Sequence, residues 1–272
     1  MKQNLPSTGD QYYLFKGTSN FRDAGGCQAD GGRRVRLGRL FRSDALNNLS
    51  ASDLAAVNRL GIRQVIDLRS QPEQHHDPDR LPPEVSYHFL PITLVWQDPF
   101  LIQTKLLSGD VRPGEFASDL LRGYSETPSA YASVFAQTFR ILLRPDGMPA
   151  LIHCTGGKDR TGMAVALIQS ALGVPRQTIF EGYLTSNLRR EIAIWRWTAL
   201  VWFASRLRTL PSHFRPLLET RHAYLQAFFE SIERQYGSVD AYLRLGLGLQ
   251  SSELERLKEK LLEAAGPEIA TR

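Results

Sequence analysis

One stretch determines how this chain folds: Leu151-Ile152-His153-Cys154-Thr155-Gly156-Gly157-Lys158-Asp159-Arg160-Thr161-Gly162. An apolar run from Pro149 to Ile152 leads into it and predicts a buried strand, and residues 163–172 have a helical pattern. A strand, a short loop with two glycines and a helix start direct several backbone N–H groups at one point. The stretch therefore predicts an anion-binding loop with a cysteine at its first position.

The remainder of the sequence predicts an α/β fold with a mostly parallel central sheet flanked by helices. Further buried strands are expected near residues 62–68 and 85–90, and helical patterns follow them. Beyond Gly173 the sequence is almost wholly helical, which predicts a helical C-terminal elaboration. We expect an N-terminal arm at residues 1–17 and a single domain at residues 18–272.

A long segment from Pro91 to Glu115 is interrupted by prolines and glycines and is expected to be irregular. A loop of this length in a compact domain is usually functional or mobile. It carries Asp98 and Asp110, two acidic side chains that could swing toward the cysteine.

Composition and charge describe a soluble globular protein with a mild preference for anionic partners. The chain has 272 residues, 42% of them hydrophobic, and a net charge of +5. This is far from the dense basic stripe of a nucleic-acid-binding protein, so no nucleic-acid partner is expected. Two cysteines, Cys27 and Cys154, cannot form a disulfide framework, and a free reactive thiol fits better than a single disulfide. The polar start, Met1 to Asp10, lacks the apolar core of a signal peptide, so we expect a cytoplasmic protein, with export by another route left open.

The loop has the groups that a phosphate ester requires of a nucleophilic catalyst. Cys154 is the candidate nucleophile, because loop amides, a helix N-terminus and the cations Lys158 and Arg160 favour its thiolate. Gly156 and Gly157 permit the backbone angles that converging amides require. The pattern indicates a two-step reaction in which the cysteine is transiently phosphorylated.

The other residues of the stretch have more specific expected roles. The planar guanidinium of Arg160 can hold two phosphoryl oxygens at once. Thr161 can donate its hydroxyl to the sulfur when the sulfur becomes a leaving group, and Thr155 belongs to the phosphate-binding segment. His153, on the expected strand, suits hydrogen bonding to backbone and orienting the loop rather than acting as a base.

The leaving alkoxide needs a proton, and Asp159 inside the loop is the favoured general acid. Asp98, on the long segment, is the main alternative, and Asp159 could instead form a structural pair with Arg22 or Arg42. Surface or structural ion pairing is the favoured interpretation of Arg22, Asp23 and Arg42.

Other interpretations of the loop fit less well. A nucleotide-binding loop would need Ser or Thr directly after Lys158, where Asp159 stands. A metal site would need clustered partners for His153 and Cys154, and none stands at ligand spacing, so no metal is expected. A buried structural cysteine would not explain the residues that follow it.

The loop resembles the signature of the bacterial atypical tyrosine and lipid phosphatases. The similarity covers about residues 18–250. It implies a protein-tyrosine-phosphatase-like fold and a cysteine-dependent tyrosine or dual-specificity phosphatase, with no metal or organic cofactor. The matching segments are His153-Cys154-x-x-Gly157-Lys158-Asp159-Arg160-Thr161-Gly162, Asn20-Phe21-Arg22-Asp23-x-Gly25-Gly26, Gly38-Arg39-Leu40-Phe41-Arg42-Ser43, Asp67-Leu68-Arg69-Ser70, Tyr183-Leu184-x-Ser186-Asn187 and Tyr236-Gly237-Ser238-x-x-x-Tyr242-Leu243.

Carried over residue by residue, the resemblance makes Cys154 the nucleophile, Arg160 the phosphate clamp, Asp159 the acid and Lys158 an additional cation. That lysine is similar to one found in phosphoinositide phosphatases. The implied substrates are phosphotyrosine, phosphoserine or phosphothreonine in proteins, and phosphoinositides, with transient contact to a membrane surface for a lipid substrate. A phosphoinositide-selective enzyme is the alternative. Sulfur transfer, arsenate reduction and phosphate recognition without turnover are remote rivals.

Two segments matter for the comparison with this family. Some relatives carry an aspartate soon after the Leu-Pro that follows the second strand, and Leu90-Pro91 here is followed by apolar residues and a threonine, which weakens the case for Asp98. Relatives can also cover the site with lid helices, and residues 190–215 match that segment. Core packing is the favoured interpretation of its aromatic residues. A mobile lid or a membrane-surface patch is the alternative.

Overall fold

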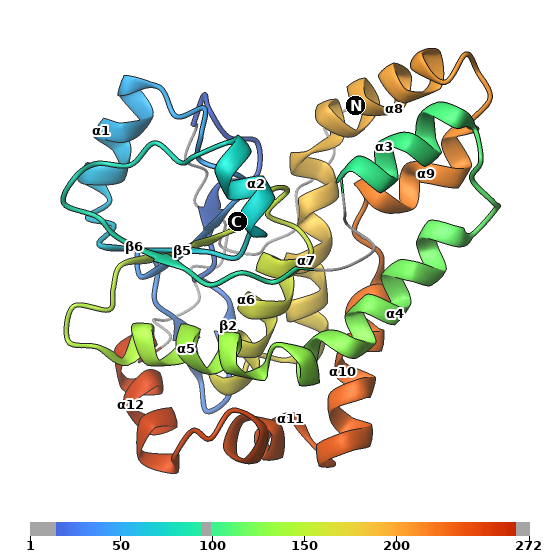
Figure 1. Cartoon of the computed structure of the whole chain (residues 1–272). Helices are drawn as coiled ribbons and strands as arrows, with labels where there is room; N and C mark the ends of the chain where they lie inside the picture. The colour runs from blue at the N-terminus through green and yellow to red at the C-terminus, as the bar shows by residue number, and fades with distance from the viewer. Residues whose placement is uncertain (1–14, 94–98, 265–272) are drawn as a thin grey trace, which may run out of the picture.

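Five strands form the central sheet, in the spatial order β1-β4-β7-β5-β6 (Figure 1). The computed structural model describes residues 15–93 and 99–264. Strands β4, β7, β5 and β6 are parallel, and β1 pairs antiparallel with β4, which confirms the predicted α/β class with a mostly parallel sheet. The strand bounds are β1 (Arg22–Asp23), β4 (Leu40–Ser43), β5 (Gln64–Asp67), β6 (Ser86–Phe89) and β7 (Ala150–His153).

A second, antiparallel sheet has the order β2-β3-β8 and joins the two ends of the described chain. Its strands are β2 (Gln28–Ala29), β3 (Arg33–Val35) and β8 (Leu262–Ala264). The predicted arm at residues 1–17 lies outside the described residues except for residues 15–17.

Twelve α-helices and one π-helical turn lie within the described residues, and the helical C-terminal elaboration is confirmed. They are α1 (Ala51–Arg59), α2 (Gln71–His76), α3 (Pro99–Ser108), α4 (Glu115–Ala130), α5 (Ala132–Leu143), α6 (Arg160–Ala171), α7 (Arg176–Arg189), α8 (Glu191–Ala204), α9 (Pro211–Leu218), α10 (His222–Tyr236), α11 (Val239–Ala241), the π-helical turn η2 (Tyr242–Gly246) and α12 (Ser251–Leu261).

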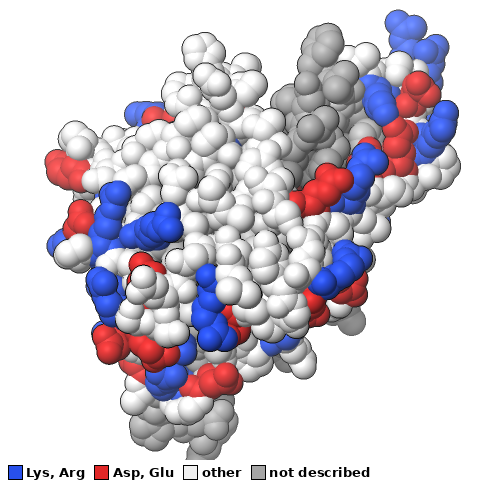
Figure 2. All heavy atoms as spheres, turned by 60° about the horizontal axis from the view of Figure 1, so that its bottom comes forward, with Lys and Arg blue, Asp and Glu red and all other residues white. Residues whose placement is uncertain are grey.

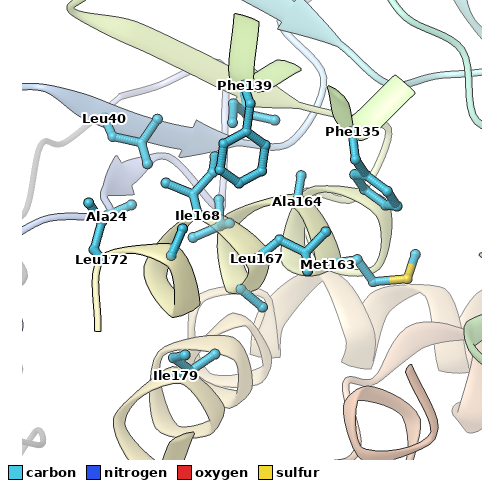
Figure 3. Close-up of a cluster of buried hydrophobic side chains, with 14 of the residues drawn as sticks. Ala24, Leu40, Phe135, Phe139, Met163, Ala164, Leu167, Ile168, Leu172 and Ile179 are labelled. Carbon is cyan, nitrogen blue, oxygen red and sulfur yellow. The ribbon is translucent and has the colours of Figure 1, made fainter. Parts of the chain in front are cut away.

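Side chains of the central strands alternate between two cores, as the period of a strand requires. On one face Phe41, Val65 and Leu151 pack with Val57 of α1. The other face packs against α6, whose residues from Met163 to Ile168 are all buried. Figure 3 shows this helix held between Phe135 and Phe139 of α5 on one side and Ile179 of α7 on the other. A helix that is apolar all round is a core helix, and its position fixes the loop that precedes it.

The segment predicted to be irregular is partly helical. Residues 99–108 form α3, which packs against α8, and the Thr209 hydroxyl donates to the carbonyl of Leu106 (2.7 Å). Short helices gain most of their stability from such tertiary packing, which local sequence does not reveal. Figure 1 shows α3, α8 and α9 together, apart from the sheet.

The surface has a mixed charge on the face drawn in Figure 2, where basic and acidic side chains lie side by side around broad uncharged areas. Among the described residues, none of the helices has the length and apolar character needed to cross a membrane.

Candidate active site

The loop from Cys154 to Asp159 connects β7 to α6 at the carboxyl ends of the parallel strands. Because β7 lies between β4 and β5, the loop sits at the middle of that edge, where open α/β sheets usually bind ligands. Cys154 directly follows β7 and is 2% exposed. Helix α6 begins at Arg160, earlier than the periodicity predicted, so its N-terminus lies directly against the loop.

The carbonyl groups of the loop are hydrogen-bonded from outside. The amide of Asn20 donates to the carbonyls of Gly156 and Gly157 (3.0 Å each), and Arg42 also donates to Gly157 (2.8 Å). The backbone N–H of Ala45 donates to Thr155 (3.2 Å). Within the described part of the chain, the backbone N–H groups from Thr155 to Lys158 have no acceptor. Four N–H groups of the loop are therefore available to an anion.

Gly157 is the position in the loop where a side chain would not fit. Its φ is +62°, and an added Cβ would lie 2.4 Å from the carbonyl oxygen of Ser43. Both the backbone conformation and the close approach to β4 require glycine here.

Arg160 is held by a carboxylate that the sequence analysis did not identify. Its two terminal nitrogens donate to the two carboxylate oxygens of Glu73, at 2.6 and 2.8 Å. Its Nε has no hydrogen-bond partner among the described residues. The predicted clamp can therefore bind phosphate through the edge formed by Nε and one terminal nitrogen, while the adjacent edge formed by the two terminal nitrogens remains on Glu73.

The environment of Glu73 keeps it ionised. Burial opposes its charge, but hydrogen bonds and attraction from Arg160, with bonds from Thr155 and Ser70, lower the pKa of Glu73 from 4.5 to about 2. Burial also acts against the charge of Arg160, yet Glu73 and the nearby charge of Cys154 raise the pKa of Arg160 above its usual value. The sequence did contain a signal for Glu73, since Ser70 and Glu73 have the spacing of a helix capping box.

Lys158 and Asp159 form a buried ion pair inside the loop, with Nζ 2.6 Å from one carboxylate oxygen, and both residues are 5% exposed. The hydroxyl of Tyr124 donates to the other carboxylate oxygen (2.7 Å) and lies 2.8 Å from the hydroxyl of Tyr183. Burial lowers the pKa of Lys158, opposed by Asp159 and assisted by Arg190. The charge of Lys158 is thus largely neutralised by Asp159 within the protein. The resemblance instead implied that this cation faces the substrate.

Arg22 and Asp23, the candidate residues near the N-terminus, form hydrogen bonds within the protein. Arg22 donates to Ser186 (3.0 Å) and to the carbonyl of Asn20 (3.1 Å), so it supports the residue that braces the loop. Asp23 accepts from the backbone N–H groups of Gly25 (2.8 Å) and Gly38 (2.5 Å). Arg22, Asp23 and Arg42 are buried, so the surface alternative in their interpretation is wrong and the structural alternative remains.

Asp98 lies outside the described residues, and its proposed acid role stays a prediction. Asp110 is exposed, and its backbone N–H donates to the hydroxyl of Ser108 (3.3 Å).

His153 is fully buried beneath the loop, next to carboxylates rather than backbone. Its Nε2 lies 3.1 Å from Asp79 and 3.8 Å from Asp67. The oxygen and nitrogen atoms of these three side chains lie within 4.8 Å of one another, a grouping that could hold a cation. However, Arg69 bonds both Asp67 and Asp79 at 2.8 Å, so a guanidinium already balances their charge.

Two hydroxyls complete the loop. Thr155 donates to Glu73 (2.5 Å), which links the start of the loop to the carboxylate that holds Arg160. Thr161 is fully buried, and its hydroxyl oxygen has no partner among the described residues. A buried hydroxyl without a partner is unfavourable unless a further group completes its bonding.

Comparison with known proteins gives consistent matches over nearly the whole chain. A family model described as the tyrosine phosphatase family matches residues 13–263. A Cupriavidus necator protein named as a tyrosine-protein phosphatase is 36% identical over 88% of this chain and 85% of its own length. The triple specificity protein phosphatase PtpB of Mycobacterium tuberculosis is 32% identical over 90% of this chain and 97% of its own length. Among solved structures, the catalytic domain of the PP-IP phosphatase SIW14 from S. cerevisiae aligns with a TM-score of 0.32 and 16% identity, over 61% of this chain and 86% of that domain.

Proposed function

The chain belongs to the tyrosine phosphatase family, and we propose that it hydrolyses phosphomonoesters at Cys154 through a phosphocysteine intermediate. One observation carries the proposal. Four backbone N–H groups without acceptors, from Thr155 to Lys158, and the unpartnered Nε of Arg160 belong to the loop that starts at this cysteine. Such a set of donors matches the oxygens of a phosphoryl group.

In the first step the thiolate of Cys154 attacks phosphorus, the P–O bond to the substrate breaks, and its electron pair leaves with the alcohol oxygen. Arg160 and the loop amides bind the phosphoryl oxygens as charge moves through them. Glu73 is a positioning residue in this scheme, because it holds the guanidinium plane while the free edge binds phosphate.

The proton for the leaving oxygen is proposed to come from the Lys158–Asp159 pair. The ammonium of Lys158 lies 2.6 Å from a carboxylate oxygen of Asp159, and burial lowers the pKa of Lys158, which favours release of that proton. A proton passing from Lys158 through Asp159 to the alkoxide leaves a neutral amine beside a carboxylate. Replacing Asp159 by Asn should then slow alkyl phosphates more than aryl phosphates, because aryloxides leave more easily without a proton. An equal loss on both would argue against this assignment.

In the second step water attacks the phosphocysteine, inorganic phosphate forms, and the sulfur leaves as a thiolate. The unpartnered hydroxyl of Thr161 supports a role as donor to that sulfur. Thr161→Val should allow the first step and slow the second, so that a phosphorylated enzyme accumulates.

The proposed substrates are phosphotyrosine first, then phosphoserine or phosphothreonine, and phosphoinositides. The M. tuberculosis relative is named for triple specificity, which supports a broad range. Arg190 supports a second phosphate near the loop, because its guanidinium carbon lies 3.5 Å from the position that a Cβ on Gly156 would occupy. Arg190→Met should therefore slow multiply phosphorylated phosphoinositides more than a phosphotyrosine peptide.

The direct test compares initial rates on a phosphotyrosine peptide, a phosphothreonine peptide and a set of phosphoinositides, using the wild type and Cys154→Ser. We expect turnover by the wild type, loss of turnover in Cys154→Ser, and retained binding of inorganic phosphate. Binding without turnover by the wild type would instead indicate a phosphate-recognition module.

A further inference from the structure

Helix α8 presents an apolar face to solvent. Ile192, Trp195 and Phe203 are 75%, 71% and 69% exposed. Their spacing of three and eleven residues from Ile192 places them on one side of the helix. Ile194 is the buried residue of α8, so the interpretation of these aromatics as core packing is wrong. The exposed apolar face consists of Ile192, Trp195, Leu200, Trp202 and Phe203, and it continues into Leu207 and Leu210. Trp197 is also exposed, on the side of the helix next to Ile194.

The same segment carries much of the basic character of the chain. Five arginines and one acidic residue, Glu191, lie between Leu188 and Arg215. Arg196 lies on the apolar side of α8, and Arg196, Arg206 and Arg208 are exposed. Only Arg196 belongs to α8 itself, and Arg206 and Arg208 follow its last residue, Ala204. A helix that exposes tryptophans and an arginine, with further arginines just beyond its end, is typical of helices that lie in the plane of a membrane surface. An anionic lipid surface complements both the apolar face and the charge.

The charge of the arginines favours one of two possible partners of this apolar face, an anionic bilayer over a second copy of the chain. In a symmetric dimer the arginines of one copy would meet those of the other, which is unfavourable. In a bilayer with anionic lipids, the lipid phosphates can form ion pairs with the arginines, and the aromatic rings can insert at the level of the headgroups.

The two ends of the α8–α9 hairpin, residues 190–219, are joined to each other, and one of them contacts the phosphate loop. Arg190 donates to the carbonyl of Leu218 (3.0 Å), and Lys158 lies 3.5 Å from the carbonyl of Glu219. Just outside, Asn187 and Thr220 exchange two hydrogen bonds, at 2.7 and 2.8 Å. A surface bound by α8 would thus lie close to the loop.

We propose that α8 binds the surface of an anionic bilayer and brings the phosphate loop to phosphomonoesters of lipid headgroups. Membrane binding depends on α8 and the residues that directly follow it, and the benefit to catalysis rests on the proposed phosphatase function. The lid expected at residues 190–215 stays a prediction.

The test is sedimentation of the full chain with vesicles of phosphatidylcholine alone or mixed with phosphatidylserine. The variant is Trp195→Ser with Phe203→Ser, and the matched control is Leu245→Ser, which removes an apolar side chain that is 77% exposed on η2, outside the hairpin. We expect the wild type and the control to bind phosphatidylserine vesicles, and the double variant to bind about tenfold or more weakly. Added salt should weaken binding, because charge contributes.

Activity is measured on a soluble aryl phosphate and on a phosphoinositide in the same vesicles. We expect the double variant to keep the first activity and lose the second. Equal vesicle binding by the wild type and the double variant would overturn the proposal, as would a dimer that dissociates on the double substitution. Vesicle binding without hydrolysis of either substrate would leave docking intact and refute the proposed function instead.

Discussion

The phosphate loop lies near the N-terminal end of helix α8, but the two regions differ in how much their side chains are buried. In the loop, Cys154, Lys158 and Arg160 are at most 5% exposed, and Asn20, Arg42 and Glu73 fix their surroundings. On α8, side chains as large as Trp195 are mostly exposed. The loop is thus fixed by contacts within the chain, whereas most of the apolar side chains on this face of α8 are open to solvent. We infer that the first region is built for chemistry and the second for contact with another surface.

The largest expected effect is at Arg160. Arg160→Lys should lower kcat/KM by about a thousandfold or more, because a single ammonium cannot bond Glu73 and phosphate together. Arg196→Lys on α8 is the matched control and should leave turnover of a soluble aryl phosphate unchanged. Steady-state kinetics of both variants test this prediction. A loss of less than tenfold in Arg160→Lys would contradict the proposed role of Arg160 in binding the phosphoryl group.

Glu73→Gln is expected to have the next largest effect. It should lower kcat more than it raises KM, by about ten- to a hundredfold, because Arg160 loses the partner that orients it. Glu73→Asp, which restores the charge, should recover part of the rate. If Gln and Asp behave alike, the carboxylate does not position Arg160.

The same carboxylate gives a pH dependence of stability. Its pKa is about 2 in the folded protein, below the usual 4.5, so its contribution is present above about pH 4.5 and is lost as the pH falls toward about 2. The contribution is on the order of 3 kcal/mol. The free energy of unfolding of Glu73→Gln, measured by urea denaturation, should therefore fall less over this range than that of the wild type. Parallel curves for the two proteins would contradict the ion pair.

The outcome also shows what the sequence could and could not predict. The strand, loop and helix around Cys154 follow from local patterns, and so does the parallel sheet, because apolar periodicity and glycine placement are local signals. The partner of Arg160 could not be assigned in the same way, since Glu73 is far from it in sequence and the capping-box spacing indicates only a helix start. The hydrogen bond from Tyr124 to Asp159 could not be assigned from the sequence either, because it depends on the packing of α4 onto the core.

The exposed face of α8 shows the opposite failure. Trp195 and Phe203 have helical spacing, and this normally predicts a core-facing side. The pattern identifies one apolar face but not what covers it. The tertiary structure shows that this face is exposed to solvent.

Gly157→Ala should cost about 1–3 kcal/mol of stability, from a positive φ and from the clash with Ser43. Gly237→Ala is the matched control, because it has φ +82° with open space around an added Cβ, so it reports the backbone cost alone. Urea denaturation of both variants measures the difference. Equal costs would mean that the close approach of the loop to β4 is unimportant.

The smallest effect is expected on α8. Trp195→Ser should change the free energy of unfolding by less than about 0.5 kcal/mol, because the side chain is already exposed. Thermal unfolding of this variant beside Ile194→Ser, which alters the buried residue of α8, tests that expectation. A large loss in Trp195→Ser would mean that the exposed face contributes to folding.

The central claim is that Cys154 carries the phosphoryl group, and trapping the intermediate tests it most directly. The wild type is mixed with an aryl phosphate, quenched in acid within the first turnover and digested, and the peptide containing residues 151–160 is examined by mass spectrometry. We expect phosphate on Cys154 in the wild type, more of it in Thr161→Val, and none in Cys154→Ser. Phosphate on another residue, or rapid turnover by Cys154→Ser, would contradict the claim.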